Sequence, residues 1–422
     1  MSLFFRVHVN QMRLREDIEA NATFGSIDAD TGNGRSAMAA TEANRDARDH
    51  LIDRMNDAGL EVAIDPIGNI EGRWYPDNVD RDVAPVAAGS HLDSVPRGGI
   101  FDGPLGVYAA LEAVRTIQEM DVSVARPISV VSFTGEEGAR FKNGLLGSSV
   151  VTGRRSLSEA LGFTDDSGIS VEEALRSIGY VGTDKINPAE WHAWLELHVE
   201  QDTTLERTNT AVGIVNSITG MTNCRVEIEG EANHAGATPM DERTDALAAS
   251  SEFILGIEAA ANEVVETKSE TAVGTVGEIH TTPNSKSVVS GATEMIIDIR
   301  DIDYAAMNAI VDAATDVLNR LEDERNVSTS FDRYRDQRPS HMTERCVEAA
   351  ITAAESLDVS HRPMHSAAMH DTAHVADKTN TVMLFAPSRD GISHNPLEWT
   401  DWKDCSAAAD VLTETIRLLA SK

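Results

Sequence analysis

Cysteine and long apolar runs are both scarce in this sequence. Its three cysteines, Cys224, Cys346 and Cys405, are odd in number and far apart, which excludes a disulfide framework and a CxxC metal site and predicts reduced, buried thiols. No apolar run approaches the roughly 18–20 residues that cross a bilayer. The segment Met1–Asn10 has neither the apolar core nor the cleavage site of a signal peptide, so we expect a cytoplasmic protein without a membrane partner.

Positive charge is scarce as well. Lysine and arginine total 36 against 69 acidic residues, which gives a net charge of −33, and only seven of the basic residues are lysines. Such a surface repels nucleic acids and anionic membranes, so we expect neither as a partner. The acidic residues are spread along the whole chain, a pattern that suits solubility at high salt, where the Debye length falls to roughly 3 Å at 1 M. We therefore hypothesise a halophilic source.

The remaining composition favours two globular domains. Hydrophobic residues make up 41% of the 422 positions, enough for buried cores. Short β-rich apolar runs alternate with helical patterns, which is typical of an α/β fold with a mixed sheet flanked by helices. We expect strands at Ala84–Gly89, Ile128–Phe133, Trp191–His198 and Thr381–Phe385, and helices at Leu105–Met120 and Ser406–Leu419.

The middle of the chain has a different order of elements. It predicts, in order, two strands, a long helix, two strands, a second helix and a last strand, at Val212–Ile218, Asn223–Glu229, Asp241–Thr267, Thr271–His280, Thr293–Arg300, Tyr304–Leu321 and Val327–Arg333. That order indicates a separate α+β sandwich inserted into the α/β domain. We place this lid and dimerisation domain at residues 211–331 and the catalytic domain at residues 1–210 and 332–422.

The strongest chemical signal follows the first of these strands. His91 and Asp93 lie two residues apart in Gly-Ser-His-Leu-Asp-Ser, so their side chains leave a strand end on the same side. Asp102 follows in a Gly-Gly-Ile-Phe-Asp-Gly turn that can fold back on the same site. Sites in open α/β sheets form beyond the carboxyl ends of strands, and zinc, manganese and cobalt accept histidine and carboxylate ligands.

Three more clusters follow other predicted strands. The segment Ser132–Gly138 carries Glu136 and Glu137, which point in different directions as neighbours, so that one can bind a metal and the other can act on water. His198 ends the next strand, and His394 lies in a loop after the last one. Each feature alone is usually structural or solvated. Their joint placement, after apolar β-runs or in glycine-rich turns, predicts a metal site.

With these motifs in view, the chain resembles the di-zinc aminoacylase/carboxypeptidase superfamily, in its branch of N-carbamoyl-L-amino-acid hydrolases, β-ureidopropionases and allantoate amidohydrolases. The resemblance runs from about Phe24 to the C-terminus and includes Ala47-Arg-Asp49, Ala58-Gly-Leu60 and Asp65-Pro-Ile-Gly-Asn69 besides the metal segments. These motifs together are highly specific for the branch. The resemblance implies two divalent metal ions per subunit, Zn²⁺ ahead of Mn²⁺, Co²⁺ or Ni²⁺.

The resemblance also implies how the metal ligands divide. Asp102 would bridge the two ions. His91 and His198 would complete the coordination of one ion. Glu137 and His394 would complete the other. A histidine at position 198 is what this branch shows, where many peptidase relatives carry an acidic residue.

Three residues would serve the reaction without binding metal. By the same resemblance, Asp93 would orient His91, and Glu136 would be the general base that takes a proton from water. In the family, a lid histidine of the partner subunit stabilises the tetrahedral oxyanion; His234 matches it, ahead of a long helix for which Asp241 is the expected N-cap. The match implies a homodimer and a hinge motion that closes the site.

Substrate-binding residues are implied in the same way. Arg300, in Asp298-Ile-Arg300, would clamp the substrate carboxylate with two hydrogen bonds, and Asn284 would bind the polar end of the substrate. Like His234, both residues are candidates for binding substrate in the partner subunit's site. The remaining substrate-binding positions are Gln201, Ser388, Gly391 and Ser393.

The sequence departs from the branch at a few places, which leaves the substrate open. Asp202-Thr203 stands where Gly-Pro is common, Ser94 replaces a threonine, and Ser366–Asp371 lacks the usual glycines before His-Asp. The leading prediction is hydrolysis of an N-carbamoyl-L-amino acid to the amino acid, ammonia and carbon dioxide, with allantoate or β-ureidopropionate as alternative substrates. Hydrolysis of N-acyl amino acids or dipeptides is a weaker alternative. A metal-binding scaffold without catalysis would not need Glu136.

Overall fold

The computed structural model describes residues 7–28, 32–77, 79–120 and 122–421. The first six residues of the segment that argued against a signal peptide therefore lie outside the described part. The chain divides into two compact units: unit 1 comprises Met1–Asn216 with His341–Lys422, and unit 2 comprises Ser217–Ser340. The domain borders expected at 211 and 331 lie inside unit 1 and unit 2, respectively.

Strand pairing explains where the borders fall. Strand β8, Val212–Ile218, was expected in the inserted domain, but it pairs antiparallel with β17, Thr381–Ala386, in the sheet of unit 1. Strand β14, Ser328–Gln337, extends beyond the expected border and stays paired with β9, Gly220–Glu229, as far as Gln337. A border drawn at 331 would cut through that strand.

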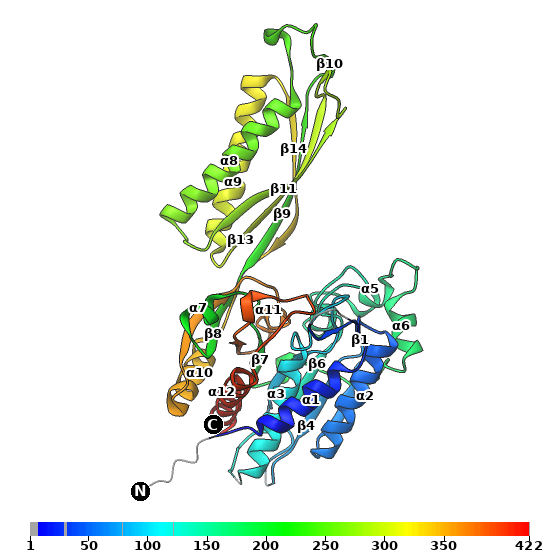
Figure 1. Cartoon of the computed structure of the whole chain (residues 1–422), viewed down its shortest axis with the longest axis vertical. Coiled ribbons are helices and arrows are strands. Elements are labelled where there is room, and N and C mark those ends of the chain that lie inside the picture. Colours follow the sequence, from blue (N-terminus) through cyan, green and yellow to red (C-terminus); the bar gives the residue numbers. More distant parts are fainter. Residues whose placement is uncertain (1–6, 29–31, 78, 121, 422) are drawn as a thin grey trace. The chain divides into compact units, whose positions relative to one another are not determined.

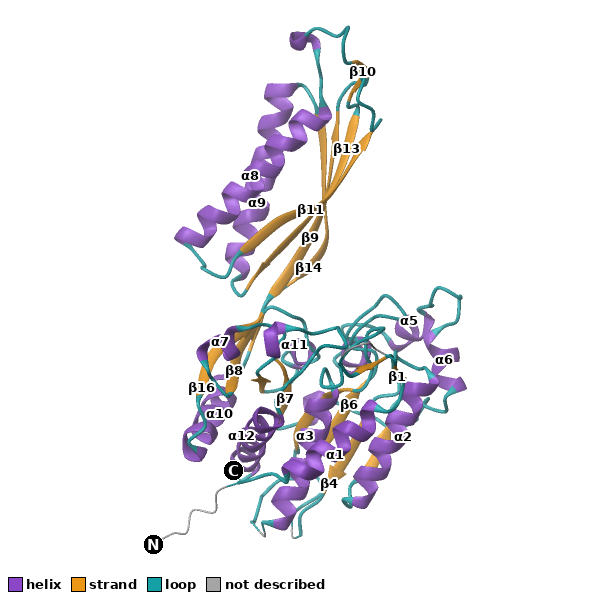
Figure 2. Cartoon of the chain, viewed as in Figure 1, coloured by secondary structure: helices purple, strands orange, loops and turns teal. Residues whose placement is uncertain are grey.

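Unit 1 is built on a mixed sheet (Figures 1 and 2), in the order β15-β8-β17-β7-β5-β6-β4-β3, with β16 paired to β8. The neighbours β17, β7, β5 and β6 run parallel to one another, whereas β4 is antiparallel to β6 and β3 is antiparallel to β4. The strands not yet given are β3 Glu61–Ile64, β4 Ile70–Trp74, β5 Val86–His91, β6 Ile128–Phe133, β7 Ala193–Val199, β15 Ser340–His341 and β16 His361–Ser366, with a separate short pair β1 Ser26–Ile27 and β2 Gly34–Arg35.

Both faces of the central strands are buried, as expected for parallel strands. Alternate residues of β5 and β6, such as Ala88 and Val130, join a core that includes residues of helices α3 and α12. The intervening residues, such as Ala87 and Val131, join a second cluster on the other face. The helices of unit 1 are α1 Gln11–Ala22, α2 Glu42–Asp57, α3 Pro104–Glu119, α4 Leu146–Val151, α5 Leu157–Gly162, α6 Val171–Ser177, α7 Thr204–Thr208, α10 Glu344–Leu357, α11 Thr372–Val375 and α12 Trp402–Ala420.

Unit 2 is a four-stranded antiparallel sheet in the order β11-β13-β9-β14, with two long helices on one face (Figure 1). Residues of β9 and β13 alternate strictly: one set, including Val226 and Ile297, packs under the helices, and the other faces outward. This alternation is the pattern of a sheet with one covered face. The bounds are β10 Asn233–His234, α8 Ala246–Thr267, β11 Val273–Thr282, β12 Val288–Val289, β13 Ala292–Asp301 and α9 Tyr304–Arg325.

The N-cap expected for the long helix of unit 2 was wrong. Asp241 lies in a short 3₁₀ turn, and α8 begins only at Ala246, where the side chain of Asp245 accepts hydrogen bonds from the amides of Leu247 and Ala248. Both positions offer an aspartate, so the sequence alone does not distinguish them. Of the helices in the described part of the chain, none combines the length and apolarity needed to cross a bilayer.

Candidate active site

The carboxyl ends of adjacent strands bring the predicted metal ligands together in unit 1. His91 is the last residue of β5, and His198 is the penultimate residue of β7, which runs parallel to β5. Glu137 lies in the turn after β6, the other parallel neighbour of β5. His394 lies in the loop after β17, which runs parallel to β7. Four parallel strands therefore deliver residues to one edge of the sheet.

Asp102 lies at the centre of this arrangement, and each of its two oxygens faces a different group. Its Oδ1 lies 3.5 Å from His91 Nε2 and 3.2 Å from His198 Nε2. Its Oδ2 lies 3.4 Å from His394 Nε2, which in turn lies 3.2 Å from Glu137 Oε2. The ligand atoms of His91, Asp102 and His198, and those of Asp102, Glu137 and His394, lie within 4.8 Å of one another. Asp102 is the member common to both groups.

The hydrogen bonds of the two buried histidines fit a metal site. His91 Nδ1 lies 3.1 Å from the carbonyl oxygen of Asp93, and His198 Nδ1 lies 3.0 Å from that of Val199. A carbonyl only accepts, so each Nδ1 carries a hydrogen, and in the neutral ring each Nε2 then presents a lone pair to a metal ion. His91 Nε2 is buried without a hydrogen-bond partner. A buried unpaired nitrogen beside a carboxylate is costly unless a cation occupies the space between them.

The charges of the site depend on burial and close neighbours. Burial alone would raise the pKa of Asp102, but the charge and hydrogen bonding of His198 hold it well below its ordinary value. Burial raises the pKa of Glu137 to about 7 and that of Glu136 well above its usual range. The hydrogen bond from His394 to Asp102 raises the pKa of His394 to about 9. Closely spaced carboxylates repel one another when they are ionised together. An added positive charge would relieve that repulsion.

Glu136 lies beside the ligands without joining either group. Its Oε2 lies 3.9 Å from His91 Nε2, and its side chain is only 10% exposed. A carboxylate that lies beside a metal site without being a metal ligand can accept a proton from water. Glu137 differs, because its Oε1 accepts a hydrogen bond from the amide of Val95 while its Oε2 faces His394.

Asp93, which was expected to orient His91, contacts the ring of His91 through its backbone carbonyl. The carboxylate lies 3.8 Å from His91 Nδ1, and only the backbone carbonyl of Asp93 is within hydrogen-bond distance. The carboxylate instead accepts the amides of Gly135, Glu136 and Glu137, at 3.1–3.3 Å. One carboxylate that caps three successive amides fixes the turn that carries Glu136 and Glu137. Asp93 therefore positions the glutamate pair.

The glycine after Asp102 is required by its surroundings. Gly103 has a φ of 83°, a conformation that few other residues adopt without strain. A Cβ atom at this position would lie 2.6 Å from His91 Nδ1 and 2.5 Å from its Cε1. The turn can thus fold back on the strand end only with glycine there, which brings Asp102 beside His91.

Of the predicted substrate-binding residues in unit 1, Gln201 and Ser393 reach the centre. Gln201 Nε2 donates to Asp102 Oδ2 at 2.9 Å and lies 3.1 Å from Ser393 Oγ. The Ser393 hydroxyl also lies 2.9 Å from Asp102 Oδ2. Gln201 and His394 have φ values of 60° and 53°, left-handed conformations that cost energy outside glycine and that cluster at functional sites as well as at helix ends.

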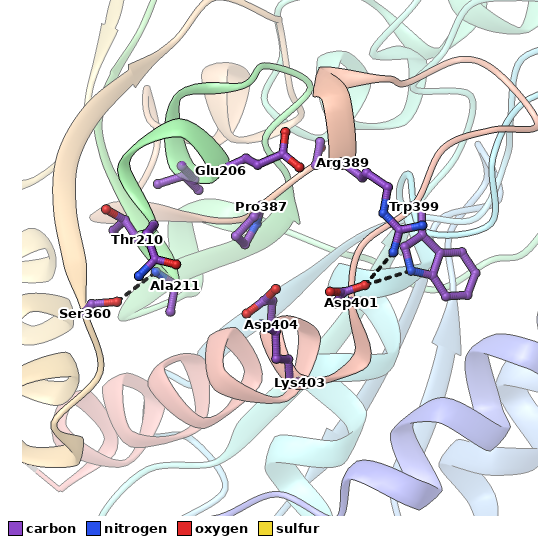
Figure 3. Close-up of a pocket in the computed structure, with 13 residues that line it drawn as sticks. Glu206, Thr210, Ala211, Ser360, Pro387, Arg389, Trp399, Asp401, Lys403 and Asp404 are labelled. Atoms are coloured by element: carbon purple, nitrogen blue, oxygen red, sulfur yellow. Dashed lines mark hydrogen bonds and ion pairs between the residues drawn. The ribbon is translucent and has the colours of Figure 1, made fainter.

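Ser388 and Gly391 have supporting positions. Ser388 is fully buried, and its hydroxyl oxygen accepts the amide of Gln201 at 3.0 Å. It also lines a polar cavity of about 340 Å³ that contains none of the metal-ligand candidates (Figure 3). On the wall of this cavity, Arg389 points toward Asp401 and donates to it at 2.7 Å. Gly391, with a φ of 67°, has no room for a Cβ beside Thr203.

Two buried glutamates that the motifs did not single out hold the site together. Glu398 Oε1 accepts the amides of Phe101 and Asp102 at 2.9 and 3.1 Å, and its Oε2 lies 3.1 Å from Ser393 Oγ. It thus joins the Asp102 turn to the His394 loop. Glu196 is the other, with Ser90 and Thr372 as its hydrogen-bond donors. The signal for Glu196 was present, as an acidic residue inside an apolar strand; the sequence around Glu398 has no such signal.

The residues predicted for the lid domain lie in unit 2. His234, in β10, is exposed, and its Nδ1 accepts the amides of Gly236 and Ala237 at 3.0 and 3.1 Å. In the neutral ring the hydrogen then resides on Nε2, so the exposed edge of the ring is a hydrogen-bond donor. Asn284 is exposed in the link between β11 and β12.

Arg300 lies far from both residues within the sheet of unit 2. It pairs with Val273 at one end of the β11–β13 hairpin, whereas Thr282 and Ala292 close the other end, next to Asn284. Eight residue steps along β13 separate the two ends, about 27 Å at the usual rise of a strand. Arg300 and Asn284 of one chain therefore cannot contact the same small substrate.

The fold and the site together define a metal-dependent hydrolase. Residues 87–418 match peptidase family M20/M25/M40, and the chain belongs to this family. It is 37% identical to the N-carbamoyl-L-amino acid amidohydrolase of Geobacillus stearothermophilus, over 94% of this chain and 96% of that protein. It is 34% identical to the ureidoglycolate hydrolase of Arabidopsis thaliana, over 90% of this chain and 81% of that protein.

A solved structure agrees with the sequence relatives. The amidase of the hydantoinase/carbamoylase family from Burkholderia multivorans has a TM-score of 0.89 with this chain at 32% identity, and the match covers 99% of each chain. The resemblance expected from the motifs and the α/β fold class are thus confirmed.

Proposed function

We propose that this chain hydrolyses the carbamoyl C–N bond of N-carbamoyl-L-amino acids and releases the amino acid, ammonia and carbon dioxide. The observation that carries the proposal is the convergence of four other potential ligands on Asp102, with a spare carboxylate, Glu136, beside them. The 37% identical N-carbamoyl-L-amino acid amidohydrolase, matched over nearly its full length, supports this substrate class.

The two groups of side chains that share Asp102 would hold two divalent ions, for which Zn²⁺ suits the histidine and carboxylate set and Mn²⁺, Co²⁺ or Ni²⁺ are alternatives. When bound, such ions polarise the scissile carbonyl and acidify water. Glu136 takes the proton of the attacking water on its carboxylate and returns it to the leaving nitrogen. Asp93 keeps Glu136 in place through the three amides that it caps.

Unit 2 supplies the contacts to the substrate in this proposal. Arg300 binds the carboxylate of the substrate, Asn284 binds its polar end, and His234 donates Nε2–H to the developing oxyanion. Because about 27 Å of strand separates Arg300 from Asn284, one substrate needs these residues from two chains. That distance supports a homodimer in which His234 and Asn284 serve the partner subunit's site.

A panel assay for released ammonia tests the function. The metal-loaded protein would be given N-carbamoyl-L-amino acids, β-ureidopropionate, allantoate, ureidoglycolate and N-acetyl amino acids at high salt. We expect turnover of the N-carbamoyl-L-amino acids. Activity on N-acetyl substrates alone, measured as release of the free amino acid, would reject the proposal.

Adjacent glutamates provide a matched pair of variants. Glu136→Gln should keep both metal ions and lose at least about 100-fold in rate, the lower range for acid–base catalysis. Glu137→Gln should lose rate together with one metal ion per chain. Unchanged turnover in Glu136→Gln would remove it as the base.

Hydrolysis of another ureido acid is the second candidate function. The relative named ureidoglycolate hydrolase, 34% identical over 90% of this chain, favours this alternative. The same residues would act on either substrate, and only the groups that contact the rest of the substrate would differ. Turnover of allantoate or ureidoglycolate above every N-carbamoyl-L-amino acid would select it.

The composition also bears on the salt concentration and the compartment in which the protein works. The net charge of −33 suits concentrated salt, and the three cysteines are free and buried, as expected in a reducing compartment such as the cytoplasm. We propose a halophilic, cytoplasmic enzyme. Equal activity and melting temperature with and without molar salt would contradict the first part.

A further inference from the structure

The outward face of the unit 2 sheet carries a small polar cluster around Arg300. Asp298 and Arg300 lie two residues apart on β13, so both side chains leave the same face of the strand. Asn223 on β9 is the direct cross-strand partner of Asp298. The same face is free of the helices, which pack on the opposite side of the sheet.

Asp298 holds the guanidinium of Arg300 by one edge only. Arg300 Nε donates to Asp298 Oδ1 at 2.8 Å, and Nη2 donates to Asp298 Oδ2 at 3.2 Å. Asn223 Nδ2 donates to the same Oδ2 at 3.0 Å and so fixes the carboxylate. Nη1 and the second hydrogen of Nη2 form the other edge of the fork, which has the geometry that binds a carboxylate with two parallel hydrogen bonds.

The residues directly opposite Arg300 do not compete with a ligand for this second edge. On the two flanking strands, Val273 and Met221 are its direct partners, and neither side chain can pair with a cation. Among the described residues, Asp298 is the only acidic side chain that forms an ion pair with Arg300. The side chains of Arg300 and Asp298 are 37% and 33% exposed, so a ligand can reach them.

We propose that Asp298, fixed by Asn223, is a positioning residue that turns the free edge of Arg300 toward the carboxylate of the substrate and so selects acids over neutral analogues. The inference rests on the proposed function, in which Arg300 binds that carboxylate. A partly exposed ion pair contributes little to stability, so a role in folding does not explain the arrangement. Removing Asp298 should therefore leave the protein folded.

The position of Asp298 also permits the opposite effect on binding of the acid. The direction in which KM changes therefore tests the proposal. A carboxylate beside Arg300 cancels its charge and repels a second carboxylate. If neutralisation were its main effect, loss of Asp298 would improve binding of the acid. If positioning is its main effect, loss of Asp298 lets the guanidinium rotate and weakens binding of the acid.

The experiment compares an N-carbamoyl-L-amino acid with its neutral primary amide as substrates of the metal-loaded enzyme. In Asp298→Ala we expect KM for the acid to rise about tenfold, the size expected when an aligned charge-assisted hydrogen bond is lost, and KM for the amide to change much less. The kcat values should stay near those of the wild type. Asn223→Ala should shift KM for the acid in the same direction by a smaller factor.

A matched control lies on the same two strands. Glu294 pairs with Arg225 at 3.1 Å on the same face, farther along the sheet. Glu294→Ala should leave the KM values of both substrates unchanged. A lower KM for the acid in Asp298→Ala, or an equal rise for acid and amide, would overturn the inference.

The proposed function fails separately from this inference. A wild-type enzyme without turnover on any ureido substrate would overturn the proposed function. Calorimetric binding of the same acid and amide would then decide the inference, because weaker binding of the acid to Asp298→Ala than to wild type supports it. Equal binding to both proteins, or no preference of the wild type for the acid, overturns it.

Discussion

The two halves of the candidate metal centre share one aspartate but are built differently. In the first half, the side chains of His91 and His198 are 1% and 2% exposed and come from strand ends. In the second half, His394 is 52% exposed and comes from a loop with left-handed backbone at Asp390, Gly391 and His394. The first half is fixed by the central sheet, whereas the second depends on loop conformation.

This difference has a consequence for metal binding. The carbonyls of Asp93 and Val199 orient the first pair of histidines before any ion arrives. Among the described residues, the His394 ring forms ion pairs with Asp102 and Glu137. A prepared site binds an ion without ordering its ligands first, so we expect a tight ion at the buried half and a labile ion at the exposed half.

The largest expected effect is at Asp102, because it belongs to both halves. Asp102→Ala should lower the metal content of both halves and reduce activity by more than about 100-fold, the upper end of the loss for a residue that only supports a ligand. Metal content by mass spectrometry and the rate of ammonia release measure the two effects. Retention of two tightly bound ions in this variant would show that Asp102 does not bridge them.

The second expected effect separates the halves. Slow titration of the zinc-loaded wild type with a chelator should remove the two ions in two steps. His394→Ala should abolish the step at lower chelator concentration and keep the other, and His198→Ala should do the reverse. A single step in the wild type, or the loss of both ions in His394→Ala, would contradict the difference between the halves.

The third effect is the pH dependence of the exposed half. The pKa of about 9 at His394 and of about 7 at Glu137 belong to the metal-free protein. An ion needs His394 neutral and Glu137 ionised, so protons compete with it and affinity falls as pH drops. From pH 9 down to 7 we expect about a tenfold loss per pH unit, one proton per ion, and a steeper loss below 7 as Glu137 also takes a proton. Zinc binding to His198→Ala, which keeps only this half, measures the slope; a flat profile from 7 to 9 would contradict it.

The buried half could be predicted from the sequence better than the rest. His91 and His198 end or nearly end apolar strands, and the rule that sites form at the carboxyl ends of parallel strands places them together. The three amides that the carboxylate of Asp93 caps could not be predicted, because residue spacing says nothing of contacts to a distant turn. Glu398 was missed because its partners are backbone amides almost 300 positions away.

The borders of unit 2 were misplaced for a related reason. A strand pattern such as that of β8 shows that a segment pairs but not with which strand it pairs, and β8 pairs with β17 in unit 1. The N-cap of α8 was misplaced because Asp241 and Asp245 carry the same side chain, and only the backbone shows which one precedes the first helical turn. Local patterns therefore predicted element types well and the long-range partners poorly.

The smallest expected effect concerns Glu398, which joins the two halves through the Asp102 turn and Ser393. In Glu398→Gln the amide oxygen can still accept the amides of Phe101 and Asp102, and the new NH₂ group can donate to Ser393 Oγ, which leaves the Ser393 hydroxyl hydrogen for Asp102. Each partner stays satisfied, so zinc affinity at both halves should change by less than about threefold, under 1 kcal/mol.

Glu398→Ala leaves two buried amides without an acceptor and should weaken zinc binding at both halves by about tenfold or more. Chelator competition on the two variants measures the ratio. If Glu398→Gln were as damaging as Glu398→Ala, the negative charge of Glu398 rather than its hydrogen bonds would support the centre, and the exposed half would depend on it as a second source of charge.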